Sequence, residues 1–194
     1  MGAIFASLGK TITAGVVILV IIIFAAGGAG KFGEHAWWTF VMRWLHVMSG
    51  VMWIGILWYF NFVQTPSMPK IPDEQKPAVS KVIAPTALFW FRWAALATVI
   101  TGLLVAGMSG YLMNALTLGK GFTAIGIGMW LALVMAFNVW FIIWPNQKKA
   151  LGIVTVPAEE KAAAAKLAGM TSRINTMLSI PMLFCMVAQQ NGGL

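Results

Sequence analysis

Two basic side chains in one apolar run of the sequence have the spacing of a cofactor-binding helix face. Arg43 and His46 are three residues apart and Gly50 follows His46 by four, so a helix would place all three on one side. An imidazole ligates iron, and a glycine one turn away leaves room for a flat porphyrin. Arg43 could then pair with a haem propionate. The pattern predicts a b-type haem site with His46 as the metal ligand.

A lone histidine in an apolar helix also has a plainer explanation. His46 could hydrogen-bond a neighbouring helix or a buried water, and Gly50 could mark a close contact between helices. His35 lies eleven residues before His46, about 16 Å along one helix, so both cannot bind one iron from a single chain. A partner subunit could supply the second axial ligand, or the iron could be five-coordinate. The chain itself offers four methionines at similar depth: Met108, Met129, Met182 and Met186.

A second set of polar side chains falls toward the opposite ends of the apolar runs. Arg92, Asn138 and Arg173 stand in three different runs, accompanied by Asn61, Gln64 and Asn175. No Asp or Glu lies in any run, so two arginines with several amides predict a site for an anion or a quinone. The plainer alternative is that Arg173 reaches lipid phosphate from a helix end and that Asn138 links two helices.

The elements that must position these side chains are long apolar helices. Of 194 residues, 60% are hydrophobic and only 9% charged, against about a quarter charged in soluble domains. One core cannot hide so much apolar surface, so a bilayer must cover it. We expect an all-α integral membrane bundle of about five transmembrane helices. Their approximate ranges are 11–28, 37–63, 84–108, 122–144 and 167–188.

The lysines predict how this bundle is oriented. Five spans place eight lysines on one side of the membrane, at positions 10, 70, 76, 81, 148, 149, 161 and 166. Only Lys31 and Lys120 fall on the other side. By the positive-inside rule the N-terminus and both long connections are cytoplasmic, and the C-terminus lies outside. The net charge of +8 is therefore a topology signal, and no nucleic-acid partner is expected.

Several long aromatic motifs make the chain resemble a known family. They are Arg43–Gly55, Asn61–Gln64, Phe91–Trp93, Asn138–Gln147 and Ser172–Thr176. Over roughly residues 37–190 the chain resembles the membrane domain of the bacterial membrane-bound urate hydroxylases, the urate oxidase N-terminal family. The resemblance implies a multi-pass protein of the bacterial inner membrane. Residues 31–194 would be a four-helix membrane domain, and residues 1–30 an extra N-terminal transmembrane helix.

The resemblance also bears on partners and site residues. Full-length members join this membrane region to a c-type cytochrome and are linked to urate oxidation. This sequence contains no Cys-x-x-Cys-His haem-attachment motif, so it resembles a short form without the cytochrome domain. The residues that match the family's polar positions are Arg43, His46, Arg92, Asn138 and Arg173.

Three functions stay open at this point. The first is a redox subunit that binds b-type haem at His46 and a quinone or anion near Arg92 and Arg173, and exchanges electrons with a partner such as a cytochrome. The second is a non-catalytic accessory subunit that packs against other membrane subunits or forms a homo-oligomer. The third is urate oxidation, ranked last because the cytochrome motif is missing.

Overall fold

The fold is helical throughout the part of the chain that the computed structural model describes, residues 2–192, which contains no strand. Four helical stretches in it are long and apolar enough to cross a membrane: Leu8–Ala25, His35–Lys70, Lys76–Met108 and Thr123–Ala150. The prediction of an all-α membrane bundle is therefore confirmed. The orientation of the bundle across the membrane stays a prediction.

The chain divides into two compact units, and the first ends at Val41. It contains α1 (Gly2–Phe5), α2 (Leu8–Ala25) and the 3-10 turn η1 (Gly28–Lys31). Gly27 has a φ of 72°, a left-handed conformation that glycine adopts without a steric penalty, and this ends α2. The Trp38 indole N–H then donates to the Phe32 carbonyl at 2.9 Å, which fixes the turn that leads into α3 (His35–Trp58).

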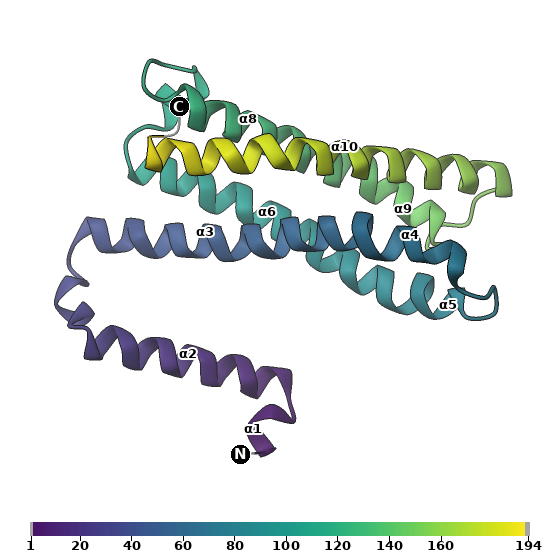
Figure 1. Cartoon of the computed structure of the whole chain (residues 1–194), viewed down its shortest axis with the longest axis horizontal. Coiled ribbons are helices and arrows are strands. Elements are labelled where there is room, and N and C mark those ends of the chain that lie inside the picture. The colour runs from purple at the N-terminus through teal and green to yellow at the C-terminus, as the bar shows by residue number, and fades with distance from the viewer. Residues whose placement is uncertain (1, 193–194) are drawn as a thin grey trace. The chain divides into compact units, whose positions relative to one another are not determined.

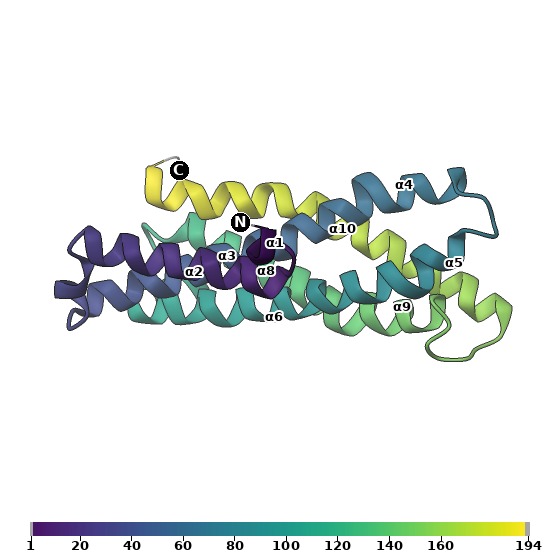
Figure 2. The same ribbon diagram turned by 90° about the horizontal axis from the view of Figure 1, so that it is seen from below.

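The second unit begins at Met42 and contains most of α3 and every later element. In chain order these are η2 (Tyr59–Gln64), α4 (Thr65–Ser67), η3 (Met68–Lys70), α5 (Lys76–Ala78), η4 (Val79–Ile83), α6 (Ala84–Met108), α7 (Leu112–Leu116), α8 (Thr123–Phe137), η5 (Asn138–Ile143), α9 (Trp144–Ala150) and α10 (Ala158–Asn191). Figures 1 and 2 show α4, α5 and α9 at one end of this unit and the C-terminal end of α10 at the other. Its core includes the fully buried side chains of Trp53, Leu57, Phe91 and Met135.

Helix α10 contains the range 167–188 that the sequence predicts as a fifth span, but it is not among these four stretches. Ser172, Arg173 and Asn175 lower its mean hydropathy. It runs beside α8 (Figure 1), and hydrogen bonds hold it near both ends. Gln189 Nε2 donates to the Gly121 carbonyl at 3.0 Å, and Lys149 Nζ lies 2.7 Å from Glu160 Oε1. The predicted fifth span thus packs against a membrane-length helix, and its crossing of the membrane stays a prediction.

Three of the spans widen into a π turn close to a proline. The π turns are η2, η4 and η5, and each ends two residues before a proline: Pro66, Pro85 and Pro145. A proline has no N–H to donate, and its ring clashes with the carbonyl four residues earlier. A wider turn at that place relieves the clash. Two of these turns carry Asn61 and Asn138, so they also decide where the amides of the inner half point.

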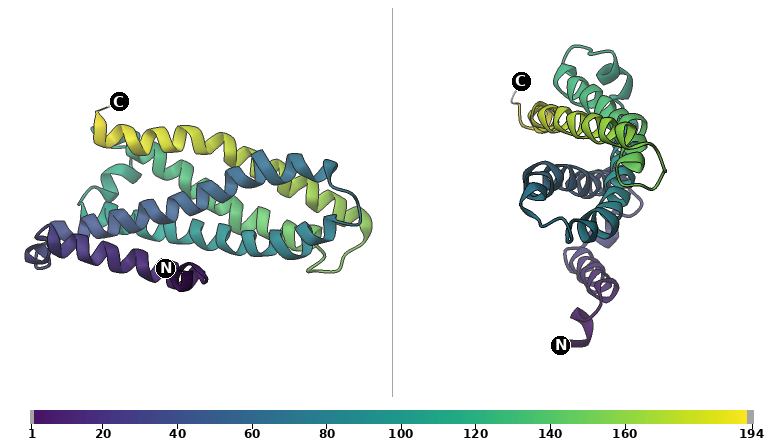
Figure 3. Two further views of the ribbon diagram at one scale, coloured as in Figure 1. Left: turned by 60° about the horizontal axis from the view of Figure 1, so that its bottom comes forward. Right: turned by 90° about the vertical axis from the view of Figure 1, so that its right-hand side faces the viewer.

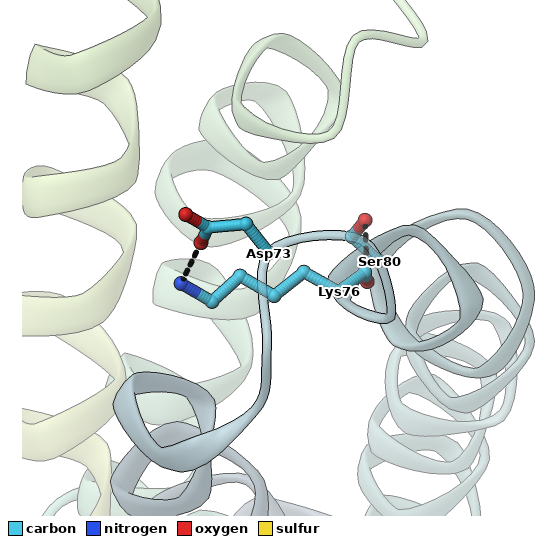
Figure 4. A network of polar contacts seen from close by, with 3 residues as sticks. All are labelled: Asp73, Lys76 and Ser80. Carbon is cyan, nitrogen blue, oxygen red and sulfur yellow. Dashed lines mark hydrogen bonds and ion pairs between the residues drawn. The ribbon is translucent and has the colours of Figure 1, made fainter.

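The connection between η3 and α5 is fixed by a local ion pair. Lys76 Nζ lies 2.6 Å from Asp73 Oδ1, and the Ser80 hydroxyl donates to the Lys76 carbonyl at 3.1 Å (Figure 4). The hydrogen bond from Lys76, reinforced by its charge, lowers the pKa of the Asp73 carboxyl. Because the carboxylate is exposed to solvent, the pair orders this turn and contributes little to global stability.

Candidate functional site

A cavity of about 610 Å³ lies between α3, α6, α8 and α10. This volume falls in the range of roughly 300–1,000 Å³ that is typical of small-molecule and cofactor sites. The lining is mainly apolar, with few polar groups. The right-hand view of Figure 3 looks along these helices. The cavity therefore has the size and character of a site for a large apolar ligand with a few anchoring groups.

His46 lines this cavity from α3 and is anchored by α6. Its Nδ1 lies 2.9 Å from the Thr98 carbonyl oxygen and 3.3 Å from the Thr101 hydroxyl oxygen. Because a carbonyl oxygen can only accept, Nδ1 carries the ring proton and Nε2 keeps its lone pair. Nε2 has no hydrogen-bond partner among residues 2–192. Metal-binding histidines commonly donate their other N–H to a backbone carbonyl, so His46 has the arrangement of a ligand.

The ring of His46 packs directly on the backbone of α6 at a residue that sequence reasoning missed. A Cβ atom added to Gly102 would lie 2.8 Å from His46 Cε1 and 3.1 Å from Nδ1. The one signal in the sequence is a glycine within an apolar run, which is typical of close helix approach. Gly50 also lines the cavity, but a Cβ there would meet only Thr98, at an ordinary 3.9 Å. The close approach is therefore at Gly102.

Arg43 lines the same cavity one turn from His46. Its Nε is buried and makes no hydrogen bond within the described residues. Tyr111, which follows α6, lines the cavity as well. Burial raises the pKa of the Tyr111 phenol, and the positive charge of Arg43 acts in the opposite direction. A guanidinium without a carboxylate partner in a largely apolar cavity favours a ligand with an anionic group.

Three of the four methionines considered as second axial ligands line the cavity. Met129 and Met182 are buried, and Met186 is partly buried. Met108 is not among the lining residues. Trp53 contributes one more polar group, because its side chain is fully buried and its indole nitrogen has no partner among the residues described. The cavity thus offers a thioether opposite the histidine helix and a free donor deeper in.

The predicted inner polar residues do not meet in one site. Asn138 Nδ2 donates to Asn175 Oδ1 at 2.8 Å, and Asn175 Nδ2 donates to the Met135 carbonyl at 2.9 Å. Both amides are buried, and together they join α8 and η5 to α10. Asn61 Nδ2 similarly donates to Ser172 Oγ at 2.8 Å. These amides hold helices together.

The two inner arginines lie outside the cavity. The Arg92 guanidinium carbon is 3.8 Å from the centre of the Trp144 ring, whereas Arg173 is exposed on α10. Neither residue lines the cavity. Of the six predicted cofactor-binding residues, the structure therefore gathers three at the cavity: Arg43, His46 and Gly50.

The described residues hold no group of three or more His, Cys, Asp or Glu side chains that could bind a metal ion. An iron at His46 would thus take most of its ligands from something other than these side chains.

Comparison with known proteins gives one match. Residues 107–192 match the family model described as urate oxidase N-terminal. Neither the curated proteins nor the solved structures give a match. The matched segment contains α7 to α10, and hence two walls of the cavity with Met129 and Met182, whereas Arg43 and His46 precede it. Over residues 107–192, the chain is therefore similar to the urate oxidase N-terminal family.

Proposed function

We propose that this chain is a membrane-embedded electron-transfer subunit in which His46 binds the iron of a b-type haem. One observation carries the proposal: the Thr98 carbonyl takes the Nδ1 proton, and this leaves the lone pair of Nε2 free on a residue that lines a cofactor-sized cavity. A histidine with a purely structural role would need only the hydrogen bond from Nδ1. A metal also requires the free lone pair of Nε2.

The chain's own residues have separate tasks in this proposal. His46 ligates, the Thr98 carbonyl fixes the ring tautomer, and Gly102 sets how closely the ring approaches α6. Arg43 offers a positive charge to a propionate, and the apolar walls exclude water. Met129 or Met182 is the chain's own source of a sixth ligand. A bound haem would supply one-electron transfer, which no side chain here provides.

The test is an absorption spectrum of the gently purified chain, recorded oxidised and then reduced with dithionite. We expect a Soret band and sharpened α and β bands, with about one haem per chain. The His46→Ala variant should lose this pigment, whereas His35→Ala should keep it, because His35 does not line the cavity. A colourless wild-type protein would refute the proposal.

An accessory role in a larger membrane complex is the second candidate. The observation that favours it is the exposed aromatic surface of α8 and η5, where Phe137 and Phe141 are more than half exposed and stack on each other. Such a surface suits lipid or another membrane subunit. Under this reading His46→Ala would alter assembly of the complex and leave the spectrum unchanged.

Urate oxidation is the third candidate and rests on the family description alone. Electron transfer from urate would need an acceptor, and a partner cytochrome in the bacterial inner membrane is the one we propose. Incubating the purified chain with urate and an added acceptor tests it: urate loss that requires His46 would support this activity, and no loss would exclude it for the chain alone.

A further inference from the structure

The Trp144 ring gathers two positive charges at the end of the bundle where α9 lies. The Arg92 guanidinium carbon is 3.8 Å from the ring centre, and Lys148 Nζ is 5.7 Å from it. Arg92 also lies 5.6 Å from the centre of the Phe89 ring. The Arg92 guanidinium and the Lys148 ammonium, two positive charges, therefore both lie close to the Trp144 ring and border it together.

No carboxylate neutralises this pair among residues 2–192. The two ion pairs found there join Lys76 to Asp73 and Lys149 to Glu160. Lys149 is the chain neighbour of Lys148, and it binds Glu160 at the start of α10, while neither Arg92 nor Lys148 forms an ion pair within the described residues. The cluster thus carries uncompensated positive charge.

The cluster also holds buried donors without acceptors. Arg92 Nη1 is buried and makes no hydrogen bond to a described residue, and the same is true of Trp140 Nε1. Trp140 lies one turn before Trp144 and packs edge-on against Trp93 at 5.4 Å. Buried donors normally find an acceptor, so the unpaired Nη1 of an unneutralised arginine indicates an acceptor from outside the described residues.

We propose that Arg92, Lys148 and the Trp144 ring bind the phosphate group of an anionic phospholipid. A guanidinium at stacking distance from an indole keeps its N–H groups in its own plane, where they can bind phosphate oxygens in pairs. Tryptophan and lysine at a helix end are typical of the membrane–water interface, where lipid phosphates lie. This end also carries most of the lysines, so the lipid would belong to the anionic inner leaflet.

The phospholipid site is independent of the haem proposal. None of its residues lines the cavity that contains His46. A colourless protein could still bind the lipid, and a haem protein could fail to do so, so the two proposals can be judged separately.

The experiment counts lipids on the whole chain. The protein is placed in nanodiscs of phosphatidylcholine that contain increasing amounts of phosphatidylglycerol. Native mass spectrometry then counts the phosphatidylglycerol molecules that stay bound after the protein is released from the nanodisc. Arg92→Gln and Lys148→Gln should each weaken retention about fivefold, the effect of one basic charge near a lipid surface. Lys166→Gln is the matched control, because Lys166 is exposed and belongs to the same lysine-rich side.

Two further variants separate the contribution of the Trp144 ring from that of the positive charges. Trp144→Leu removes the ring and keeps both charges, and should also weaken retention, while Arg92→Lys should restore part of what Arg92→Gln loses. Equal retention by Arg92→Gln and Lys166→Gln would overturn the site. Displacement of the lipid by millimolar inorganic phosphate would overturn the lipid as the ligand and point to a soluble phosphate ester.

Discussion

At the scale of single residues, the contact between His46 and Gly102 is the tightest constraint on the candidate site. The Thr98 carbonyl bonds Nδ1 of the imidazole, and one turn later on α6 the backbone of Gly102 packs against the same edge of the ring. A histidine placed so closely has little freedom to turn, and a ligand atom with fixed direction is what a rigid cofactor site needs.

Gly102→Ala tests this constraint directly. The added methyl group would displace the ring by overlap with Cε1 and Nδ1, so we expect haem content to fall severalfold while the helical circular dichroism stays the same. Gly107→Ala, in the same helix, is the control because a Cβ there meets nothing within 4 Å. Equal haem content in both variants would contradict the proposed geometry.

The Asn138–Asn175 pair makes a second prediction at this scale. Asn175→Ala leaves the Asn138 amide unpaired in the interior and removes the side-chain donor to the Met135 carbonyl. Interhelical hydrogen bonds in membranes are worth about 0.6 kcal/mol on average and up to about 1.7, so we expect a loss of about 1 kcal/mol in unfolding free energy. Denaturation in detergent measures it, with Asn114→Ala as control because Asn114 is exposed. A loss no larger than that of the control would show that the pair contributes nothing.

Residue spacing predicted part of the site and could not predict the rest. The positions of Arg43, His46 and Gly50 follow from helix geometry within one span, and the structure places all three at one cavity. Gly102 meets His46, and Arg92 meets the Trp144 ring, across more than forty positions of sequence in each case. Such pairings depend on how helices rotate and cross, and a single sequence carries no measure of that rotation.

At the scale of elements, the join between α7 and α8 is close-packed at Gly126. A Cβ on Gly126 would collide with the Ala115 carbonyl oxygen and lie 2.7 Å from Leu118 Cδ2. The first contact is with backbone, which cannot turn away.

Gly126→Ala should therefore destabilise the protein by about 1–3 kcal/mol, the usual cost of overpacking. The thermal midpoint in detergent measures the effect, and Gly55→Ala is the control because it adds a methyl group in open space. A midpoint unchanged from the control would mean that α7 can move away from α8 at little cost.

The turn around Asp73 has a pH dependence of its own. Because Lys76 lowers the pKa of Asp73, the ion pair orders the turn above the ordinary range of that carboxyl and is lost as the pH falls through the lowered value. Asp73→Asn should speed amide exchange in residues 71–78 at neutral pH, and the wild type should approach the variant in strong acid. Exchange that differs equally at both pH values would exclude the ion pair as the cause.

At the scale of the whole molecule, hydropathy predicted the all-α membrane fold because the bilayer sets the length of every apolar helix. Four of the five predicted spans are long and apolar enough to cross a membrane, and the fifth range lies in α10, which packs against α8. The π turns could not be foreseen, because a proline near a span end is compatible with a kink, a break or a wider turn.

The predicted orientation is tested by cysteine labelling. In a Cys185→Ala background, Lys120→Cys should react with an impermeant maleimide added outside intact cells, and Lys70→Cys only after the cells are opened. The physical reason is the lysine excess on the side of Lys70. Labelling of Lys70→Cys in intact cells would invert the orientation.

The place of α10 in the bundle has a consequence for biogenesis. The ribosome synthesises the helices that line the cavity in chain order, so α3, α6 and α8 are made before α10. Until α10 docks, Asn138 has no amide to bond and the wall containing Met182 is missing. A ligand that contacts all four helices therefore meets a complete set of walls only after the last of them leaves the ribosome, which makes α10 the element that completes the cavity.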